Sequence, residues 1–264
     1  DSMDVTAPPS STASDLWLVR QPSRPRGSLR LFCFPHAGGN AWAFRSWAAA
    51  MPEQIEVCAV QLPGHGHRIR EVALHDFEVL LWQLAEAVAP ELDRPYAFFG
   101  HSLGALLAFE LARRLRDRTG AEPRHLFVSG CNAPHLPKES DDLSQGDDEA
   151  IIGKLQELNC SPPQVLQNRE LMALMLPVLR ADFAVYQSYV YRPSPLLRCP
   201  ITVFAGWSDP RTAPDGIEAW RQHTSGRFAV QGFPGDHFFV ATEERAVVRT
   251  VVQSLLDTRQ AGHY

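Results

Sequence analysis

The sequence of 264 residues contains no uninterrupted apolar stretch that approaches the roughly 20 residues needed to span a bilayer. Lysine is almost absent, since only Lys138 and Lys154 accompany the arginines. Acidic residues outnumber basic ones by 30 to 25, so the formal net charge is −5 at pH 7. These absences argue against a membrane-spanning protein, a basic membrane-surface protein and a nucleic-acid-binding protein.

Cysteine is scarce, and its five positions show neither the CxxC nor the Cys/His spacing of metal sites. Cys33, Cys58 and Cys131 lie in apolar strand-like runs, where free thiols pack as small hydrophobic residues. Cys160 and Cys199 lie near expected loops. An odd number of cysteines without a disulfide framework is typical of a reducing compartment. We therefore expect a cytoplasmic protein without a metal site.

Short apolar runs that are rich in β-forming residues alternate with helical patterns. The expected strands are 29–34, 56–61, 96–99, 125–129, 201–205 and 228–230, and the expected helices are 41–50, 77–89, 102–118, 216–223 and 243–257. Such alternation predicts an α/β fold, with a mostly parallel central sheet flanked by helices on both faces. The chain is long enough for one large domain of this kind.

Two segments depart from this rhythm. Residues 1–25 are rich in Ser, Pro and Thr, and we expect a flexible lead-in there. Residues 135–198 contain no clear strand, so we expect a helical lid inserted between two parts of the core, 26–134 and 199–264. Such a lid would lie over the carboxyl ends of the strands, where open α/β sheets bind ligands.

The lid contains two helical patterns, 147–159 and 168–191. Pro177 interrupts the second pattern, and we expect it to kink or divide that helix. Met172 and Met175 lie in the same pattern, and methionine suits a surface that adapts to varied apolar groups. These methionines are candidates to line a substrate site, although docking of the lid on the core explains them equally well.

The pentapeptide 100–104 reads Gly-His-Ser-Leu-Gly, between a predicted strand and a predicted helix. A serine on a sharp strand-to-helix turn exposes its Oγ, and small flanking residues permit the strained backbone. The context makes a chance match the weaker interpretation. Ser102 is therefore predicted to be a nucleophile.

A nucleophilic serine needs a base and an acid that orients the base. Three histidines follow Ser102 outside the lid and the extreme C-terminus: His125, which begins a strand, His223, which ends a helical pattern, and His237. His237 lies on a turn between the last strand and the last helix, which is where such a base belongs. His237 is the predicted base.

The acid is expected on a loop after a strand. Residues 130–134 offer no carboxylate after one strand, whereas Asp209 follows the next strand. Asp236 is the rival because it adjoins His237, but neighbours on one turn usually point apart. Asp209 is the predicted acid.

Two backbone N–H groups should stabilise the oxyanion. One belongs to Leu103, directly after the nucleophile, and Ala37 in the glycine-containing loop 34–39 is the candidate for the other. His36 in that loop is a candidate to line the site, although a structural role is equally reasonable. His65 and His67 suggest a metal site, but a turn beside the active site is the better interpretation because no partner ligand lies nearby.

Five motifs in this order resemble the type II thioesterases of polyketide and nonribosomal peptide assembly lines. They are Phe-Pro-His-Ala-Gly-Gly at 34–39, Leu-Pro-Gly-His-Gly at 62–66, Gly-His-Ser-Leu-Gly at 100–104, Gly-Trp-Ser-Asp at 206–209 and Gly-Asp-His-Phe-Phe at 235–239. The resemblance extends over about residues 29–256. It departs from the family at His65, where many members have arginine.

The resemblance implies an α/β-hydrolase fold with a helical lid and a Ser102–His237–Asp209 triad. It implies a free-standing enzyme that hydrolyses acyl thioesters on the phosphopantetheine arm of an acyl or peptidyl carrier protein, and so removes aberrant or stalled acyl units. It implies no cofactor, and we expect a monomer. A basic rim of Arg68, Arg70 and Arg211 is the candidate site for the phosphate of the arm.

Other functions remain open at this point. A product-releasing terminal thioesterase domain has the same motifs, and a carboxylesterase differs by its preference for oxygen esters. A non-catalytic binding protein on a hydrolase scaffold would require a broken triad, whereas all three triad residue types are present.

Overall fold

The computed structural model describes residues 13–20, 27–138, 143–158 and 163–257. A seven-stranded sheet runs through it in the order β1-β3-β2-β4-β5-β6-β7. The strands are β1 (Leu18–Val19), β2 (Leu29–Phe34), β3 (Ile55–Val60), β4 (Tyr96–His101), β5 (Leu126–Ser129), β6 (Ile201–Gly206) and β7 (Phe228–Phe233). Only β1 pairs antiparallel, with β3, and the other neighbours are parallel. The predicted mostly parallel α/β sheet is confirmed.

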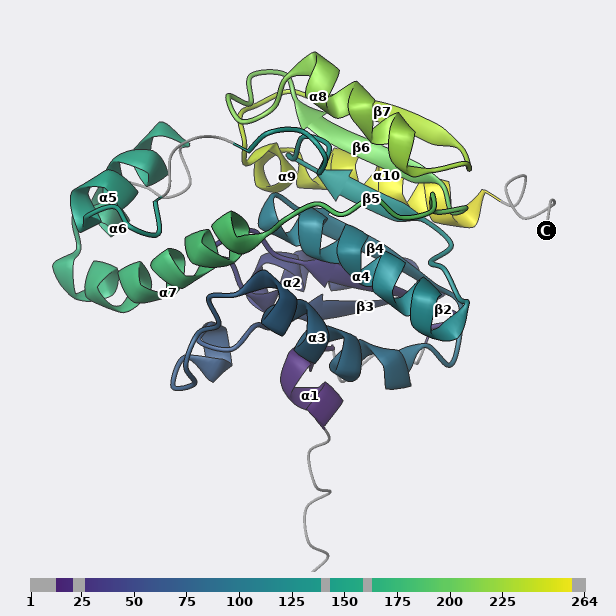
Figure 1. Ribbon diagram of the computed structural model, residues 1–264, viewed down its shortest axis with the longest axis horizontal. Helices are drawn as coiled ribbons and strands as arrows, with labels where there is room; N and C mark the ends of the chain where they lie inside the picture. The colour runs from purple at the N-terminus through teal and green to yellow at the C-terminus, as the bar shows by residue number, and fades with distance from the viewer. Residues whose placement is uncertain (1–12, 21–26, 139–142, 159–162, 258–264) are drawn as a thin grey trace, which may run out of the picture.

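Helices cover both faces of the sheet (Figure 1). In the α/β part they are α1 (Ala13–Trp17), η1 (Ala41–Phe44), α2 (Arg45–Ala50), η2 (Gly66–Arg68), α3 (Phe77–Val88), η3 (Ala89–Glu91), α4 (Leu103–Thr119), α8 (Pro214–Glu218), η4 (Ala219–His223), α9 (Phe239–Thr242) and α10 (Glu244–Leu256). Helices α3 and α4 pack on one face, and α2, α9 and α10 pack on the other.

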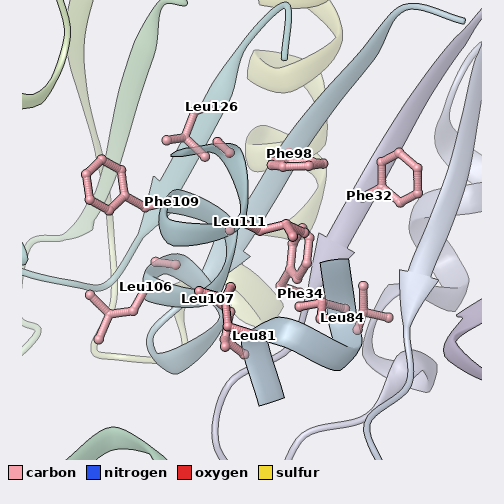
Figure 2. Close-up of a cluster of buried hydrophobic side chains, with 14 of the residues drawn as sticks. Phe32, Phe34, Leu81, Leu84, Phe98, Leu106, Leu107, Phe109, Leu111 and Leu126 are labelled. Carbon is pink, nitrogen blue, oxygen red and sulfur yellow. The ribbon is translucent and has the colours of Figure 1, made fainter. Parts of the chain in front are cut away.

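The core follows from the alternation of side chains along the strands. Phe32, Phe34 and Phe98 point toward α3 and α4, as Figure 2 shows, whereas Leu31 and Phe99 belong to the cluster on the opposite face. All five side chains are fully buried. This two-sided burial explains why the central strands are almost continuously apolar in sequence.

The N-terminal segment is more ordered than the expected lead-in. Residues 13–17 form α1, and Leu18 pairs with Val60 at the edge of the sheet. Trp17 and Leu18 are buried in the core. Two apolar residues at the end of a Ser/Pro-rich segment were a weak sequence signal, and the open edge of β3 supplied their partner. Residues 1–12 and 21–26 lie outside the described part of the chain.

Between β5 and β6 the chain forms three helices, α5 (Asp148–Glu157), α6 (Pro163–Leu166) and α7 (Arg169–Ser188). This insertion lies at the ends toward which the strand arrows point in Figure 1. Of the two outcomes expected of Pro177, a kink or a division, division of the second helix does not occur, because α7 is one continuous helix of 20 residues that contains Pro177. Buried residues on both sides of the proline, Met172 and Leu176 before it and Leu179 and Val185 after it, hold α7 together as one helix.

No helix in the described part of the chain combines the length and hydrophobicity that crossing a bilayer requires.

Candidate active site

Ser102 occupies the turn between β4 and α4 with φ of 55° and ψ of −117°. Among the residues that the structure describes, Ser102 is the one residue other than glycine that has a positive φ. Such a conformation is costly for a residue with a Cβ atom and persists only where the surroundings impose it. This strained turn places Ser102 at the N-terminus of α4 and at the carboxyl end of β4, a central strand.

The flanking glycines are required by close packing of the backbone. A Cβ atom on Gly100 would lie 2.1 Å from the carbonyl oxygen of Gly104, and one on Gly104 would lie 2.2 Å from that of Phe34. Real Cβ contacts do not reach such distances, so any side chain at either position would push α4 away from the sheet. The Gly-x-Ser-x-Gly spacing is thus a packing requirement of this turn.

His237 and Asp209 are brought together by the loops after β7 and β6. The Nδ1 atom of His237 lies 2.9 Å from Oδ2 and 3.1 Å from Oδ1 of Asp209. Both side chains are almost completely buried. The carboxylate thereby favours the tautomer with a proton on Nδ1, which leaves Nε2 free to accept a proton.

The rival residues have other partners. Asp236 accepts a hydrogen bond from the Phe238 N–H, within its own turn. His125 stacks on Phe127, and His223 lies against His135. The structure therefore places Asp209, rather than Asp236, beside the imidazole of His237.

Ser102 and His237 line one cavity of about 140 Å³ at the interface between the α/β part and the insertion. Its apolar wall comes from the insertion, and its other residues belong to strand-end loops and the start of α4. The residues that line it are His36, Ala37, Gly38, Ser102, Leu103, Leu155, Leu158, Met175, Leu179, Phe183, Tyr186, Arg211, His237 and Phe238.

The candidate oxyanion donors lie at this cavity. Leu103 is the first residue of α4, and the N–H groups at a helix N-terminus have no partner within the helix. Ala37 and Leu103 both line the cavity beside Ser102. The Gly39 N–H bonds to the His36 carbonyl, which closes a tight turn around Ala37. Both residues therefore lie where donors to an oxyanion at Ser102 are expected.

The three candidate lining residues have different positions. His36 and Met175 line the cavity, as expected. Met172 instead lies 3% exposed in the small core of the insertion, against Ile151, Leu155 and Leu176. The two methionines are three positions apart and share one face of α7, but Met172 is buried within the cluster of the insertion, whereas Met175 lies at its border and reaches the cavity.

Two further histidines, His36 and His101, lie near His237 but outside its pair with Asp209. Burial, together with the nearby His237 and His65, lowers the pKa of His36 to about 4. Burial also lowers the pKa of His101, whose Nδ1 lies 2.9 Å from the Ser129 hydroxyl. Both imidazoles are therefore neutral near pH 7, and the His101 ring lies tilted against that of His237 with the ring centroids 4.9 Å apart.

The predicted basic rim is not formed as expected. Arg68 is 6% exposed, and its guanidinium binds Glu71 and the Gln61 carbonyl. Arg70 is exposed, whereas Arg211 lines the cavity near the ring of Tyr186. A phosphate site of three arginines is therefore wrong, because Arg68 serves as an internal link between η2 and the sheet.

Sequence reasoning missed the role of His65 and Asp182. The Nδ1 and Nε2 atoms of His65 face the Pro63 carbonyl and Asp182, respectively, so neither is free for a metal ion. The described residues contain no cluster of three metal-ligating side chains. Asp182 carried a usable signal, since it is a carboxylate on the otherwise apolar face of α7.

Comparison with known proteins identifies this arrangement. A model of the thioesterase domain family matches residues 29–255. The thioesterase PikA5 of Streptomyces venezuelae is 37% identical over 258 residues, which cover 97% of this chain and 92% of PikA5. The solved structure of the type II thioesterase BorB from the borrelidin biosynthetic cluster has a TM-score of 0.84 and 36% identity, and covers 93% of this chain and 100% of BorB.

A further relative is named as a dehydrogenase and not as a thioesterase. Linear gramicidin dehydrogenase LgrE of Brevibacillus parabrevis is 42% identical over 246 residues, which cover 91% of this chain and 94% of LgrE. A dinucleotide-binding loop has the pattern Gly-x-Gly-x-x-Gly between a strand and a helix. Here the turn between β4 and α4 carries Ser102, and the loop with Gly64 and Gly66 has Ile69 at the third glycine position. The site geometry therefore agrees with a hydrolase.

Proposed function

Because the chain belongs to the thioesterase family, we propose that Ser102, His237 and Asp209 are its catalytic triad and that its substrate is an acyl thioester on a carrier protein. The observation that supports this most directly is the shared cavity, in which a strained serine lies with an imidazole held by a buried carboxylate. The editing role of type II thioesterases in polyketide and nonribosomal peptide assembly fits the similarity to BorB and PikA5.

The reaction proceeds in two halves. Ser102 Oγ attacks the thioester carbonyl while His237 Nε2 takes its proton, and Asp209 stabilises the imidazolium. The N–H groups of Ala37 and Leu103 bind the oxyanion, which then collapses and expels the thiolate, and His237 returns the proton to that sulfur. A water molecule gives a proton to His237 as it attacks the acyl-enzyme carbonyl, and the tetrahedral intermediate that forms then breaks its bond to Ser102 Oγ. The carboxylic acid leaves, and His237 returns the proton to Ser102 Oγ.

The cavity suggests which acyl groups fit. An apolar cavity of about 150 Å³ holds a benzene molecule, which has six carbon atoms. The cavity beside Ser102 has about 140 Å³ and a wall of Leu155, Met175, Leu179 and Phe183. We therefore assign it to a short acyl chain, on the scale of acetyl to hexanoyl.

A second hollow that Ser102 also lines has a more polar lining, which includes Asn132, Lys138 and Arg211. An arm that contains amide groups loses hydrogen bonds to water when it binds, and such a lining can replace them. We assign this side to the phosphopantetheine arm.

Mass spectrometry of acyl-loaded carrier proteins tests the function. We expect the wild type to release short acyl groups, and Ser102→Ala to lose at least about 10³-fold in rate and to show no acyl-enzyme adduct. Rapid cleavage of matched oxygen esters with inert carriers would instead indicate a carboxylesterase. Preferred release of one long, finished product with cyclisation would indicate a product-releasing thioesterase.

A further inference from the structure

A carboxylate of α7 connects the insertion to two loops of the α/β part. Asp182 is 2% exposed. Its Oδ2 atom accepts a hydrogen bond from the Gly38 N–H at 2.6 Å and lies 2.8 Å from Nε2 of His65. Gly38 follows the candidate oxyanion donor Ala37, and His65 belongs to the loop after β3. One oxygen atom thus joins three segments that are far apart in sequence.

The partners of His65 indicate that it carries a positive charge. Nδ1 lies 2.9 Å from the Pro63 carbonyl oxygen, and Nε2 faces the Asp182 carboxylate. Both neighbours are acceptors, and only the protonated imidazole donates from both nitrogens. Burial and the charge of Arg68 oppose protonation, but the attraction of Asp182 and both hydrogen bonds outweigh them and raise the pKa of His65. The carboxylate therefore has a buried cation as its partner.

The bond to Asp182 restrains the peptide beside the oxyanion hole. The Gly38 N–H belongs to the peptide unit that begins at the Ala37 carbonyl, so its direction fixes the plane of that unit. Gly38 has φ of +75°, and a Cβ atom there would lie 2.5 Å from Cδ2 of Leu179 on α7. Glycine is thus needed both for the backbone conformation and for the close approach of α7.

We propose that Asp182 is a positioning residue for the oxyanion hole: by holding the Gly38 N–H and the His65 imidazole, it orients the loop that presents the Ala37 N–H, and only when α7 is seated on the α/β part. This inference rests on the proposed triad and oxyanion hole. It adds that the insertion completes the catalytic site as well as walling the acyl cavity.

The coupling follows from shared residues. Met175 and Leu179 line the acyl cavity from the same helix that carries Asp182. An acyl chain that packs against these side chains favours the seated position of α7, and Asp182 then orders the loop at residues 37–38. Binding of an acyl group and assembly of the oxyanion hole therefore assist each other.

Steady-state kinetics with acetyl-N-acetylcysteamine, a small thioester, tests the role of Asp182. Misplacing a catalytic group by about 1 Å costs up to about 100-fold, so Asp182→Ala should lower kcat by about 10- to 100-fold. KM should stay within about twofold, because the lost interaction acts in the transition state. An unchanged kcat, or a loss confined to KM, would overturn the proposal.

Two variants separate positioning from general loosening of α7. In Asp182→Asn the amide oxygen can still accept the Gly38 N–H, so kcat should recover to within about threefold of the wild type. Ser188→Ala removes the hydrogen bond between the Phe77 N–H and the Ser188 hydroxyl near the end of α7, away from the oxyanion loop. Its kcat should stay within about twofold. Equal losses in Ser188→Ala and Asp182→Ala would contradict a positioning role.

Amide hydrogen exchange at Gly38 provides a readout that does not depend on thioester turnover. The Gly38 N–H should be protected in the wild type and in Ser188→Ala, and should exchange at least about 10-fold faster in Asp182→Ala. An inactive wild type with a protected Gly38 would refute the thioesterase assignment alone. An active wild type in which exchange does not respond to Asp182→Ala would refute the inference alone.

Discussion

The α/β part and the insertion α5–α7 differ in the size of the apolar core that each contains. The α/β part has continuous apolar clusters on both faces of the sheet, which include the fully buried Phe32, Phe98 and Phe99. The insertion has only a small cluster of its own around Ile151 and Leu176. Its links to the α/β part include several polar contacts, such as that of Asp182 with Gly38 and His65.

A further polar link closes the other end of α7. The Lys138 ammonium group donates to the carbonyl oxygens of Tyr186, Gln187 and Tyr189. A positive charge at a helix C-terminus also interacts favourably with the helix dipole. One of the two lysines of the sequence thus anchors the end of the helix that covers the site.

This difference between the α/β part and the insertion separates catalysis from the choice of substrate. Triad residues lie on short loops and turns of a rigid sheet, so their geometry is set by the core. Residues of the apolar cavity wall that we assign to the acyl chain lie largely on the insertion, where a few substitutions can alter the wall without disturbing the sheet. Changes in the first region should therefore reduce turnover of every substrate, and changes in the second should alter preference among substrates.

The largest effect is expected in the α/β part, at the acid of the triad. Asp209→Asn should reduce kcat by about 10³- to 10⁴-fold for all acyl groups, because His237 loses both its tautomer preference and the partner of its charge. Asp236→Asn is the matched control, since Asp236 accepts a hydrogen bond from the Phe238 N–H. Steady-state rates with acetyl and hexanoyl thioesters measure both. A larger loss in Asp236→Asn would transfer the role to Asp236.

A smaller effect is expected in the insertion, at the wall of the acyl cavity. Met175→Ala should enlarge the cavity and raise the ratio of kcat/KM for octanoyl over acetyl thioesters by about 10-fold. Leu174→Ala is the control, because Leu174 is exposed and lines a neighbouring groove and is not among the residues that line the cavity beside Ser102. Competition between the two thioesters measures the ratio. An equal shift in both variants would argue against a role of Met175 in selectivity.

Acid should destabilise the α/β part. Burial lowers the pKa of His36, His125 and His223 from 6.5 to about 4. Between these pH values the unfolded chain binds more protons than the folded one, so the free energy of unfolding should fall as pH drops from 6.5 to about 4. Urea unfolding followed by tryptophan fluorescence at several pH values measures this. A constant free energy over the range would contradict the buried neutral state.

The link to the insertion should have the opposite pH dependence. Because the folded pKa of His65 is raised, its contribution is fully present below the unfolded pKa and is lost as pH rises through the folded pKa. An NMR titration of the His65 ring should therefore give a pKa above 6.5 in the wild type and a lower value in Asp182→Asn. A wild-type value below 6.5 would show that the imidazole is neutral.

Sequence patterns predicted the sheet well because each core strand buries both faces and is therefore apolar over most of its length. They missed α1 and β1, since a two-residue strand has too little periodicity to be recognised and depends on the free edge of β3. They also left open whether Pro177 divides the second helix of the insertion, and buried residues on both sides of it keep α7 continuous.

For the site, local sequence was sufficient where the chemistry depends on one short turn. The strained Ser102 and the close contact of Gly100 with Gly104 lie within one turn, and Gly104 also meets the Phe34 carbonyl on the neighbouring strand, so the short motif 100–104 reveals all three residues. The sequence likewise determined the order of strands and helices and the positions of His237 and Asp209 on strand-end loops. Only the tertiary structure decided that Arg68 is internal, that Met175 rather than Met172 faces the cavity, and that Asp182 meets His65 and Gly38. These contacts join residues as far as 144 positions apart, and no local pattern encodes a pairing that exists only once the insertion packs on the sheet.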